Sequence, residues 1–360
     1  MPASSTKLAW GIIAAGKIAR KFSRGVQHSL TGRLATVAAR DLERAHGFAR
    51  EFDIPAAYGS YQELIEDPAV EAVYVATPHP LHAEWAIAAA RAGKHVLCEK
   101  PLAMNRAQAG RVVAAAREND VFLMEAFMYR CHPQTARLVE LVASGRIGEV
   151  RAIRATFSYL GSYDLASPKL DKKLGGGGIL DVGCYPVSLC RLVAGVAQGK
   201  AFAEPESVQG MAFIGRESGV DEYAAATLTF PGGIIAQCAC GVQLQMDNQV
   251  LVFGTRGRIE VAMPWFCSGI EGGTGHILVL DNRGDLVEDV EITTDRWLYG
   301  IEADVVAENL ERRQAPHPGM SWEDSLGNMD TLDRWREEVG LEYDSDRETR
   351  EWDTAQDMPY

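Results

Sequence analysis

The stretch LAWGIIAAGKIA, residues 8–19, decides the fold of the first part of the chain. Residues 8–14 form a continuous apolar run that predicts a buried strand, and a helix is predicted from Ile18 onward. Ala14, Gly16 and Ala19 take the three small-residue positions of a dinucleotide fingerprint: a tight turn, close approach of the backbone to pyrophosphate, and helix–strand packing. The first glycine of the fingerprint is missing, so an ordinary strand-to-helix turn stays an alternative. The candidate cofactor residues here are Ala14, Gly16, Lys17 and Ile18.

Short apolar runs alternate with helical patterns up to about residue 126. Further strands are predicted at 34–39, 72–76, 95–98 and 121–125, separated by helices at 42–52, 61–65, 81–92 and 108–118. Strands that are apolar on both faces are typical of a parallel sheet covered by helices. This α/β pattern predicts a Rossmann dinucleotide-binding domain over residues 1–126.

The period of the pattern changes after residue 126. Segments with alternating polarity predict eight strands, at 150–159, 208–214, 224–230, 234–243, 249–253, 258–261, 277–280 and 286–293. Helices are predicted at 133–144, 180–194, 299–313 and 321–339. We expect an α+β domain over residues 127–343, with a large, mostly antiparallel open sheet that binds substrate and joins subunits. Residues 344–360 are polar, and predict either a loosely held tail or an arm that packs on another subunit.

The composition excludes several classes of protein. The 360 residues are 47% hydrophobic and 24% charged, as in a globular protein with two cores, and the net charge of -13 disfavours binding to nucleic acid. No secretory signal or apolar run of about 20 residues is visible, which predicts no membrane partner. Seven cysteines, an odd number in mostly apolar surroundings, predict reduced thiols and a cytoplasmic location. Cys238 and Cys240 have no second pair nearby, so we expect no metal site.

The end of the second predicted strand bears on the choice of cofactor. NAD-dependent enzymes usually carry an acid there for the ribose diol, whereas Ala39 takes that position here. The neighbouring Arg40 can pair with a 2′-phosphate. Asp41 either caps the next helix or reaches the ribose. These residues favour NADP and leave NAD open.

Two polar motifs follow the third and fourth of these strands, at the sheet edge where α/β proteins bind ligands. They are Thr77-Pro78-His79-Pro80-Leu81-His82 and Cys98-Glu99-Lys100-Pro101. With Glu125-Ala126-Phe127-Met128-Tyr129-Arg130, they make the chain resemble the Gfo/Idh/MocA oxidoreductase family over residues 7 to about 342. The resemblance implies cofactor contacts at Thr77, Pro78, His82, Glu99 and Lys100, and substrate contacts at Lys100, Tyr129 and Arg130. The spacing of His79 and His82 suggests zinc only weakly.

A glycine-rich segment, Gly175-Gly176-Gly177-Gly178-Ile179-Leu180-Asp181-Val182-Gly183-Cys184-Tyr185, forms the second chemical cluster. The glycines predict either a mobile or a closely approached loop. A helical turn would put Asp181 and Tyr185 on one face, although Asp181 could equally be an N-cap and Tyr185 an ordinary half-buried aromatic. In the family resembled, this segment supplies the substrate pocket. Its Tyr version is similar to the dihydrodiol dehydrogenases and to aldose-oxidising members.

Together these residues predict hydride transfer between nicotinamide and a cyclic polyol, with Lys100, Asp181 and Tyr185 as the catalytic set. Tyr185 is expected to move the proton and the Lys100 ammonium to favour its phenolate. Asp181 would bind a substrate hydroxyl or pair with Lys100, and Glu99 could orient Lys100. The expected reaction is the oxidation of an aldose to its lactone or of a trans-dihydrodiol.

Other activities stay open at this level. They are a keto-sugar reductase of the anhydrofructose type, an enzyme resembling glucose–fructose oxidoreductase with a tightly held cofactor, and a non-catalytic cofactor-sensing protein. The expected partners are a small sugar or polyol and a second copy of the chain. The apolar content of residues 224–230 and 234–241 predicts pairing of subunits through the second sheet, as a dimer or a tetramer.

Overall fold

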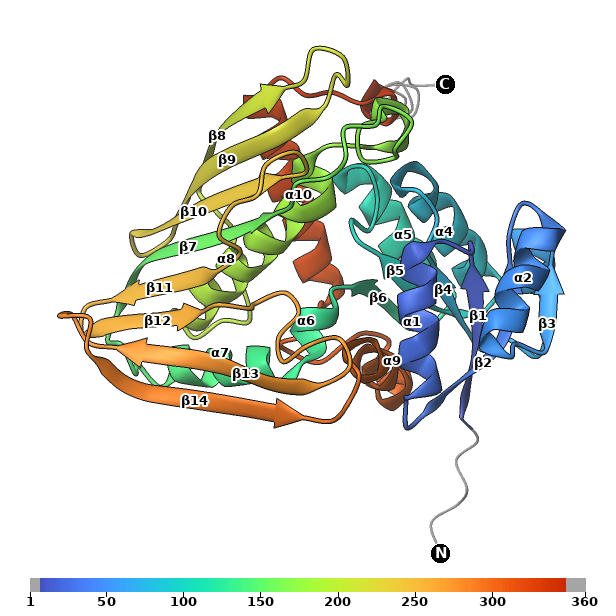
Figure 1. Cartoon of the computed structure of the whole chain (residues 1–360), viewed down its shortest axis with the longest axis horizontal. Coiled ribbons are helices and arrows are strands. Elements are labelled where there is room, and N and C mark those ends of the chain that lie inside the picture. Colours follow the sequence, from blue (N-terminus) through green and yellow to red (C-terminus); the bar gives the residue numbers. More distant parts are fainter. Residues whose placement is uncertain (1–6, 348–360) are drawn as a thin grey trace, which may run out of the picture.

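The structure, a computed structural model, describes residues 7–347 and begins with a six-stranded parallel sheet (Figure 1). Its strands lie in the order β3-β2-β1-β4-β5-β6, all parallel. The strands are β1 (Leu8–Ile13), β2 (Gly32–Ala38), β3 (Ala56–Tyr58), β4 (Ala72–Val75), β5 (His95–Glu99) and β6 (Leu123–Ala126). The order in which successive strands join the sheet reverses between β1 and β4, and a crevice at the carboxyl ends of such neighbouring strands is where open α/β sheets bind ligands.

Five helices connect these strands: α1 (Lys17–Gln27), α2 (Leu42–Phe52), α3 (Tyr61–Glu66), α4 (His82–Arg91) and α5 (Arg106–Glu118). The residues of β1, β4 and β6 are all buried, as the continuous apolar runs predicted. The Rossmann-like fold is therefore confirmed. The short strand β3 was not predicted, because three partly buried residues carry too little pattern.

An eight-stranded sheet forms the second half of the molecule. Its order is β14-β13-β12-β11-β7-β10-β9-β8, and every neighbouring pair is antiparallel except β7 with β10. The predicted mostly antiparallel sheet is confirmed. Its strands are β7 (Val150–Ser158), β8 (Ser207–Ile214), β9 (Asp221–Phe230), β10 (Ile234–Gly241), β11 (Val250–Gly254), β12 (Gly257–Val261), β13 (Gly273–Leu280) and β14 (Leu286–Thr294).

Helices cover one face of the large sheet and fill the space between the two sheets (Figure 1). The short α6 (Met128–Cys131) leads out of the first sheet, and α7 (Pro133–Ala143), α8 (Cys184–Val196) and α10 (Trp322–Glu338) pack on the second. Residues 172–196 are apolar and long enough, by composition, to cross a membrane, but that hydropathy belongs to a segment buried inside the fold. The sequence had predicted no such run.

The last helices return to the nucleotide-binding half. Helix α9 (Leu298–Glu308) packs along α1, and α10 packs on α5. The α1–α9 crossing is close: a Cβ on Gly25 would lie 2.5 Å from the Cβ of Tyr299. Asp346, in the predicted tail, forms an ion pair of 2.6 Å with Arg336 of α10. The rest of that tail, residues 348–360, lies outside the described residues.

Candidate active site

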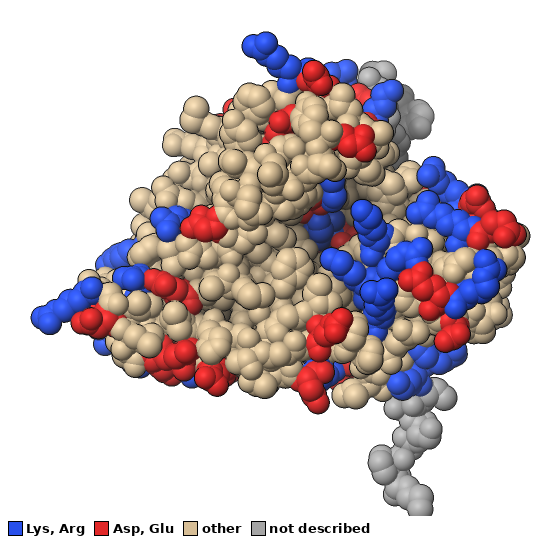
Figure 2. Space-filling view, in the orientation of Figure 1, with Lys and Arg blue, Asp and Glu red and all other residues tan. Residues whose placement is uncertain are grey.

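A cavity of about 1300 Å³ lies at the carboxyl ends of β1, β2, β4 and β5 and extends to the second sheet. Figure 2 shows a hollow between the two halves, with Lys and Arg side chains gathered on its nucleotide-domain side and mostly uncharged surface opposite. Every residue predicted to bind the cofactor lines this cavity, as do the three predicted catalytic residues. The cavity therefore joins the two motif clusters that the sequence separates by some eighty residues.

The N-terminus of α1 opens into the cavity. Gly16 precedes the helix, no side chain caps its first turn, and that turn has no acidic residue. A Cβ on Gly16 would meet no atom within 4 Å, so the space in front of these N–H groups is open. Ala14 adopts the left-handed conformation, with φ of 76°, where the fingerprint normally has glycine. Free N–H groups at a helix start bind phosphate, so this end fits a pyrophosphate.

Other cavity residues also fit a dinucleotide. Lys17 and Lys21 of α1 bring two positive charges to it, and Lys21 lies 6.0 Å from the ring of Phe266 in the second domain. The hydroxyl of Thr77 is buried and has no hydrogen-bond partner among the described residues. An unsatisfied buried hydroxyl in a cavity wall suits a polar ligand atom.

Two arginines, Arg40 and Arg44, line the cavity after the end of β2, whereas the sequence indicated Arg40 alone. Arg40 and Arg44 are exposed at the cavity edge, and Arg44 donates a hydrogen bond of 3.1 Å to the main-chain oxygen of Ala15. Asp41 caps α2 by accepting from the main-chain N–H of Glu43 at 2.9 Å and of Arg44 at 3.3 Å. Asp41 therefore caps the helix, which is the first of the two roles that the sequence left open for it.

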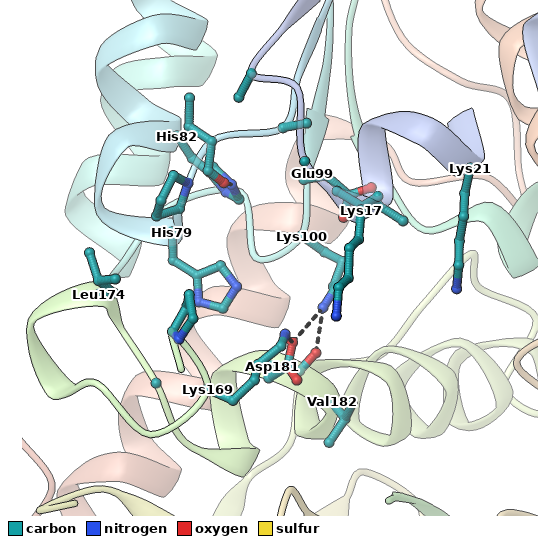
Figure 3. Close-up of a pocket in the computed structure, with 18 of the residues that line it drawn as sticks. Lys17, Lys21, His79, His82, Glu99, Lys100, Lys169, Leu174, Asp181 and Val182 are labelled. Carbon is teal, nitrogen blue, oxygen red and sulfur yellow. Dashed lines mark hydrogen bonds and ion pairs between the residues drawn. The ribbon is translucent and has the colours of Figure 1, made fainter. Parts of the chain in front are cut away.

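Lys100 and Asp181 form a buried ion pair at the other end of the cavity (Figure 3). The Lys100 Nζ donates to the main-chain oxygen of Asp181 at 2.5 Å and to its carboxylate Oδ1 at 3.2 Å. Burial disfavours the Lys100 ammonium, but the charge of Asp181, with smaller contributions from Cys184 and Glu99, outweighs that effect and raises the lysine pKa above its usual value. Lys100 is therefore a cation that retains one further N–H for a ligand.

Two residues of the β7–α8 loop also hold the Asp181 carboxylate, and the sequence did not indicate either of them. Lys169 Nζ forms a short ion pair with Oδ1, and the Tyr159 hydroxyl donates to Oδ2 at 2.6 Å. Burial disfavours the Asp181 carboxylate, but Lys169 and then Lys100 hold its pKa well below the usual range. Only the fold brings these residues together, since they lie 12 and 22 positions from Asp181.

Asp181 lies in a π-helical turn, Ile179–Gly183, immediately before α8. Such turns are rare and frequent at functional sites. The glycines before it form a closely approached loop, which decides between the two alternatives given above. A Cβ on Gly176 would lie 2.7 Å from the Lys169 carbonyl oxygen, and one on Gly177 would lie 2.1 Å from Asp221 Oδ1.

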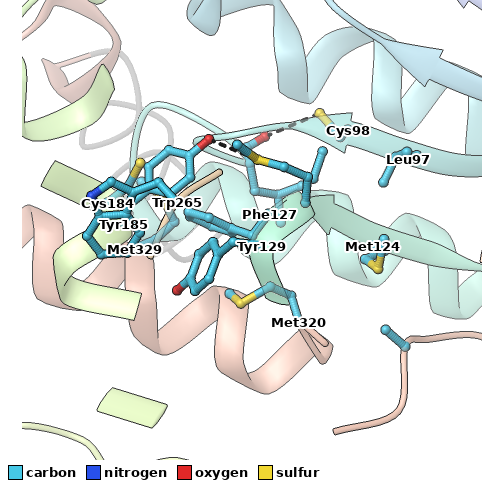
Figure 4. Packing of buried hydrophobic residues seen from close by; sticks show 14 of the residues in the cluster. Leu97, Cys98, Met124, Phe127, Tyr129, Cys184, Tyr185, Trp265, Met320 and Met329 are labelled. Carbon is cyan, nitrogen blue, oxygen red and sulfur yellow. Dashed lines mark hydrogen bonds between the residues drawn. The ribbon is translucent and has the colours of Figure 1, made fainter. Parts of the chain in front are cut away.

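Tyr185 enters the cavity from a cluster of aromatic rings (Figure 4). Phe127 and Phe157 each pack edge-on at 5.0 Å, and Trp265 lies at 5.7 Å. Its hydroxyl donates a weak hydrogen bond of 3.5 Å to the Met128 sulfur.

The Lys100 Nζ lies over the Tyr185 ring, 5.5 Å from its centre. Burial, followed by the negative charge of Glu99, raises the Tyr185 pKa well above its usual value. These two effects oppose the formation of a Tyr185 phenolate, whereas the predicted effect of Lys100 would favour it.

The two histidines after β4 have different surroundings. His82 Nδ1 lies 2.7 Å from the main-chain oxygen of Pro101 and Nε2 lies 2.8 Å from that of Thr77, so His82 joins the loops that follow β4 and β5. Burial lowers its pKa to about 4. His79 Nδ1 donates to the Gly175 oxygen at 3.1 Å, and burial lowers its pKa well below the usual value. A neutral His79 therefore keeps Nε2 as an acceptor.

Tyr129 and Arg130, expected at the substrate, do not line the cavity described here. Tyr129 is fully buried, packs at 5.7 Å from the Tyr185 ring and donates to Ser188 Oγ at 3.0 Å. Arg130 forms a buried ion pair of 2.7 Å with Asp324. Glu99 does line the cavity, and its carboxyl accepts a short hydrogen bond from Tyr74, which differs from the expected role of orienting Lys100. Tyr129 and Arg130 are therefore buried residues outside the cavity lining, and Tyr129 packs against the lining residue Tyr185.

Models of one oxidoreductase family match both halves of the chain. The family model described as "Oxidoreductase family, NAD-binding Rossmann fold" matches residues 8–127, and the "GFO/IDH/MocA C-terminal domain" model matches residues 135–260. The chain is 36% identical to trans-1,2-dihydrobenzene-1,2-diol dehydrogenase of Danio rerio over 349 residues, which cover 94% of this chain and 99% of that protein.

Solved structures extend the likeness. A 3-ketoreductase from Actinomadura kijaniata in complex with NADP and TDP-benzene is 27% identical, with a TM-score of 0.80 over 93% of this chain and 98% of the other. An aldose-aldose oxidoreductase from Caulobacter crescentus shares the fold, with a TM-score of 0.81 at 24% identity over 93% of this chain and 98% of the other.

Proposed function

The chain belongs to the Gfo/Idh/MocA family of NAD(P)-dependent oxidoreductases, and from that premise we propose that it oxidises a cyclic polyol, either an aldose to its lactone or a trans-dihydrodiol. One observation carries the proposal: the Lys100–Asp181 pair and Tyr185 share a single cavity with the open N-terminus of α1. The dihydrodiol dehydrogenases and the 3-ketoreductase to which the chain is similar support this class of substrate.

A bound dinucleotide would supply the hydride acceptor or donor. The start of α1, Lys17 and the Thr77 hydroxyl would hold it. Lys100 has two of its donors engaged by Asp181 and offers the third to the substrate oxygen. Its fixed positive charge would stabilise the negative charge that develops on that oxygen. In this proposal Lys100 acts as an electrostatic group and not as the tuner of Tyr185.

Tyr185 is the proposed proton-transfer residue. Among residues 7–347 its hydroxyl has only the weak acceptor Met128, and its ring is fixed by packing, so the proton is available to a substrate oxygen. A protonated tyrosine donates to a carbonyl oxygen in reduction. In oxidation the same group, once deprotonated, receives the proton by microscopic reversibility.

A keto-sugar reductase is the second candidate function. It is favoured by the surroundings of Lys100 and Tyr185, which raise the pKa of both groups and so favour the protonated state required to reduce a carbonyl. A panel of aldoses, cyclic polyols, dihydrodiols and keto-sugars, assayed in both directions with NADP and NAD, tests both candidates. We expect turnover of a cyclic hydroxyl compound. Turnover of ketones alone would select the reductase, and purified protein absorbing near 340 nm would indicate a tightly held cofactor, as in a glucose–fructose oxidoreductase.

NADP is the proposed cofactor. Arg40 and Arg44 both lie where a 2′-phosphate would bind, and the Asp41 carboxylate, which could otherwise bind a ribose diol, caps α2. Arg40→Ala should weaken NADP binding by about 1–3 kcal/mol and leave NAD almost unchanged, because only NADP has the phosphate. Titration of cofactor fluorescence measures both. Arg33→Ala, exposed at the opposite end of β2, is the control. A wild-type preference for NAD would contradict the assignment.

Two further proposals concern the surroundings of the enzyme. All seven cysteines are free thiols, which suits a reducing compartment, so we propose that the enzyme is cytoplasmic. We also propose that two copies of the chain associate through the large sheet. Met211, Phe213, Tyr223 and Ile235 expose between 39% and 82% of their surface on its strands β8, β9 and β10.

A further inference from the structure

We propose that Lys169 is a positioning residue for the Asp181 carboxylate, and that it keeps this group from neutralising Lys100. The inference rests on the proposed function insofar as it gives Lys100 a role at the substrate oxygen. Lys169 belongs to the β7–α8 loop, and its side chain is 45% exposed while the carboxylate that it binds is buried.

Three side chains share the two carboxylate oxygens of Asp181. Oδ2 accepts from Tyr159, and Oδ1 accepts from both Lys169 and Lys100. The Lys100 contact to Oδ1, at 3.2 Å, is longer than its contact to the main-chain oxygen at 2.5 Å. The carboxylate is thus bound mainly by the loop, and Lys100 is not drawn fully into a closed pair.

The number of lysines around Asp181 decides the net charge of this cluster. A buried carboxylate with a single lysine partner gives a pair without net charge, whereas two lysines around Asp181 leave one excess positive charge at the reacting end of the cavity. His79, which also faces this cluster, is neutral. Glu99 also contributes negative charge near Lys100, but burial raises the pKa of its carboxyl and so reduces its ionised fraction. The excess positive charge is available to a substrate oxygen as it becomes negative.

The loop that carries Lys169 is attached to the rest of the molecule by hydrogen bonds. Gly175 accepts a hydrogen bond from His79 of the first domain, and Gly176 accepts one of 2.5 Å from Tyr343. Gly177 donates to the Lys169 carbonyl oxygen at 2.9 Å. The backbone that carries Lys169 is therefore fixed to both halves of the molecule, as a residue that positions a neighbour requires.

The test compares Lys169→Met, Lys169→Arg and the control Lys173→Met. Lys173 is exposed in the same loop and does not line the cavity, so its loss removes one charge without touching Asp181. Removing the Lys169 ammonium destabilises the ionised carboxylate, so the Asp181 pKa rises. The acid limb of the pH profile of kcat/KM should then move to higher pH by at least one unit, with kcat at neutral pH about tenfold lower. Lys169→Arg should restore both, and Lys173→Met should change neither.

Two outcomes would overturn the inference. A raised KM with an unchanged pH profile would make Lys169 a direct substrate ligand. Equal losses in the Met and Arg variants, again with an unchanged profile, would make it a mere support of the loop. Tyr159→Phe provides a second variant, since it removes a donor to the other oxygen and should move the acid limb in the same direction by less. An unmoved limb in Tyr159→Phe would also count against the inference.

A spectroscopic measurement separates this inference from the proposed function. Carbon-13 NMR of carboxyl-labelled aspartate, with the Asp181 signal identified by its loss in Asp181→Asn, follows the carboxylate without any substrate. We expect that signal to titrate at higher pH in Lys169→Met than in the wild type. Equal titration would overturn the inference even if the enzyme oxidises polyols. A shifted titration would uphold the positioning of Asp181 even if no polyol is turned over.

Discussion

At the scale of single residues, the proposed mechanism assigns the proton to Tyr185 and the stabilising positive charge to Lys100. Lys100 is fixed by two contacts to Asp181, whereas Tyr185 is fixed by the packing of its ring and has only a sulfur atom as its acceptor. A residue oriented by packing can lose its hydroxyl without losing its position. The roles of Lys100 and Tyr185 can therefore be separated by substitution.

Tyr185→Phe should lower the rate of the chemical step by about 10²–10⁴-fold, the range for general acid–base catalysis. Affinity for the cofactor should barely change, because the ring and its aromatic neighbours remain. Single-turnover kinetics with a deuterated substrate measure the step. Near-full turnover in the variant, with a full isotope effect, would contradict this role of Tyr185. Proton transfer would then be assigned to His79, whose Nε2 can accept a proton.

The sequence was sufficient to identify those cavity residues that belong to a local motif. Gly16, Lys100, Asp181 and Tyr185 lie in short patterns next to predicted strand ends, and all four line the cavity. Lys169 and Tyr159 could not be found, because a lysine or tyrosine in a loop carries no pattern and their contacts depend on how that loop folds back. Arg130 was expected at the substrate because it belongs to a family motif. Its guanidinium instead forms a buried ion pair with Asp324.

At the scale of elements, α1 has to serve the cofactor at one end and the second domain along its side. Its N-terminus faces the cavity, and Gly25 near its C-terminus admits α9. A glycine within a helix normally reduces stability, so its presence here is explained by the closeness of the crossing.

Gly25→Ala should destabilise the protein by about 1–3 kcal/mol, since the new Cβ would lie within 2.7 Å of two Tyr299 atoms and of the Gly300 nitrogen. The control is Gly47→Ala in α2, where a Cβ would meet only the tip of Arg50 at 4.0 Å. That change should stabilise by about 0.5–1 kcal/mol, because alanine is the better helix former. Thermal unfolding of both variants measures whether each change lowers or raises the stability of the protein. A Gly25→Ala protein at least as stable as the wild type would contradict the close crossing.

Most elements could be predicted because their apolar period extends over several turns or alternations. Helix α2 has the predicted bounds, Leu42–Phe52. The π-helical turn at 179–183 could not be predicted, since it shares the residue preferences of the α-helix that follows and differs only in hydrogen bonding. That turn is also why Asp181 faces two lysines instead of capping a helix.

At the scale of the whole molecule, the large sheet has helices on one face and exposed apolar side chains on strands β8, β9 and β10. Phe213 and Tyr223 stack there at 5.1 Å, and Met211 is 82% exposed. Apolar clusters of this kind on a flat sheet are typical of subunit interfaces.

Sedimentation at micromolar concentration should therefore give a particle at least twice the 39.2 kDa of the chain. Ile235→Lys should shift the protein towards the monomer, because it places a charge in the apolar cluster on β10. Leu165→Lys, at an exposed apolar position in the β7–α8 loop, should leave the assembly unchanged. A wild-type particle of 39.2 kDa would contradict the proposed association.

The packing of α9 on α1 has a consequence for synthesis of the protein. During translation β1 to β6 emerge first, yet the side of α1 around Gly25 stays uncovered until residues 298–308 have left the ribosome. The nucleotide-binding domain is thus synthesised first, but its packing is complete only after α9 has been synthesised. Ribosomes that stop early release a chain with every cofactor motif and an exposed apolar helix face, which is a substrate for chaperones and proteases rather than a smaller working enzyme.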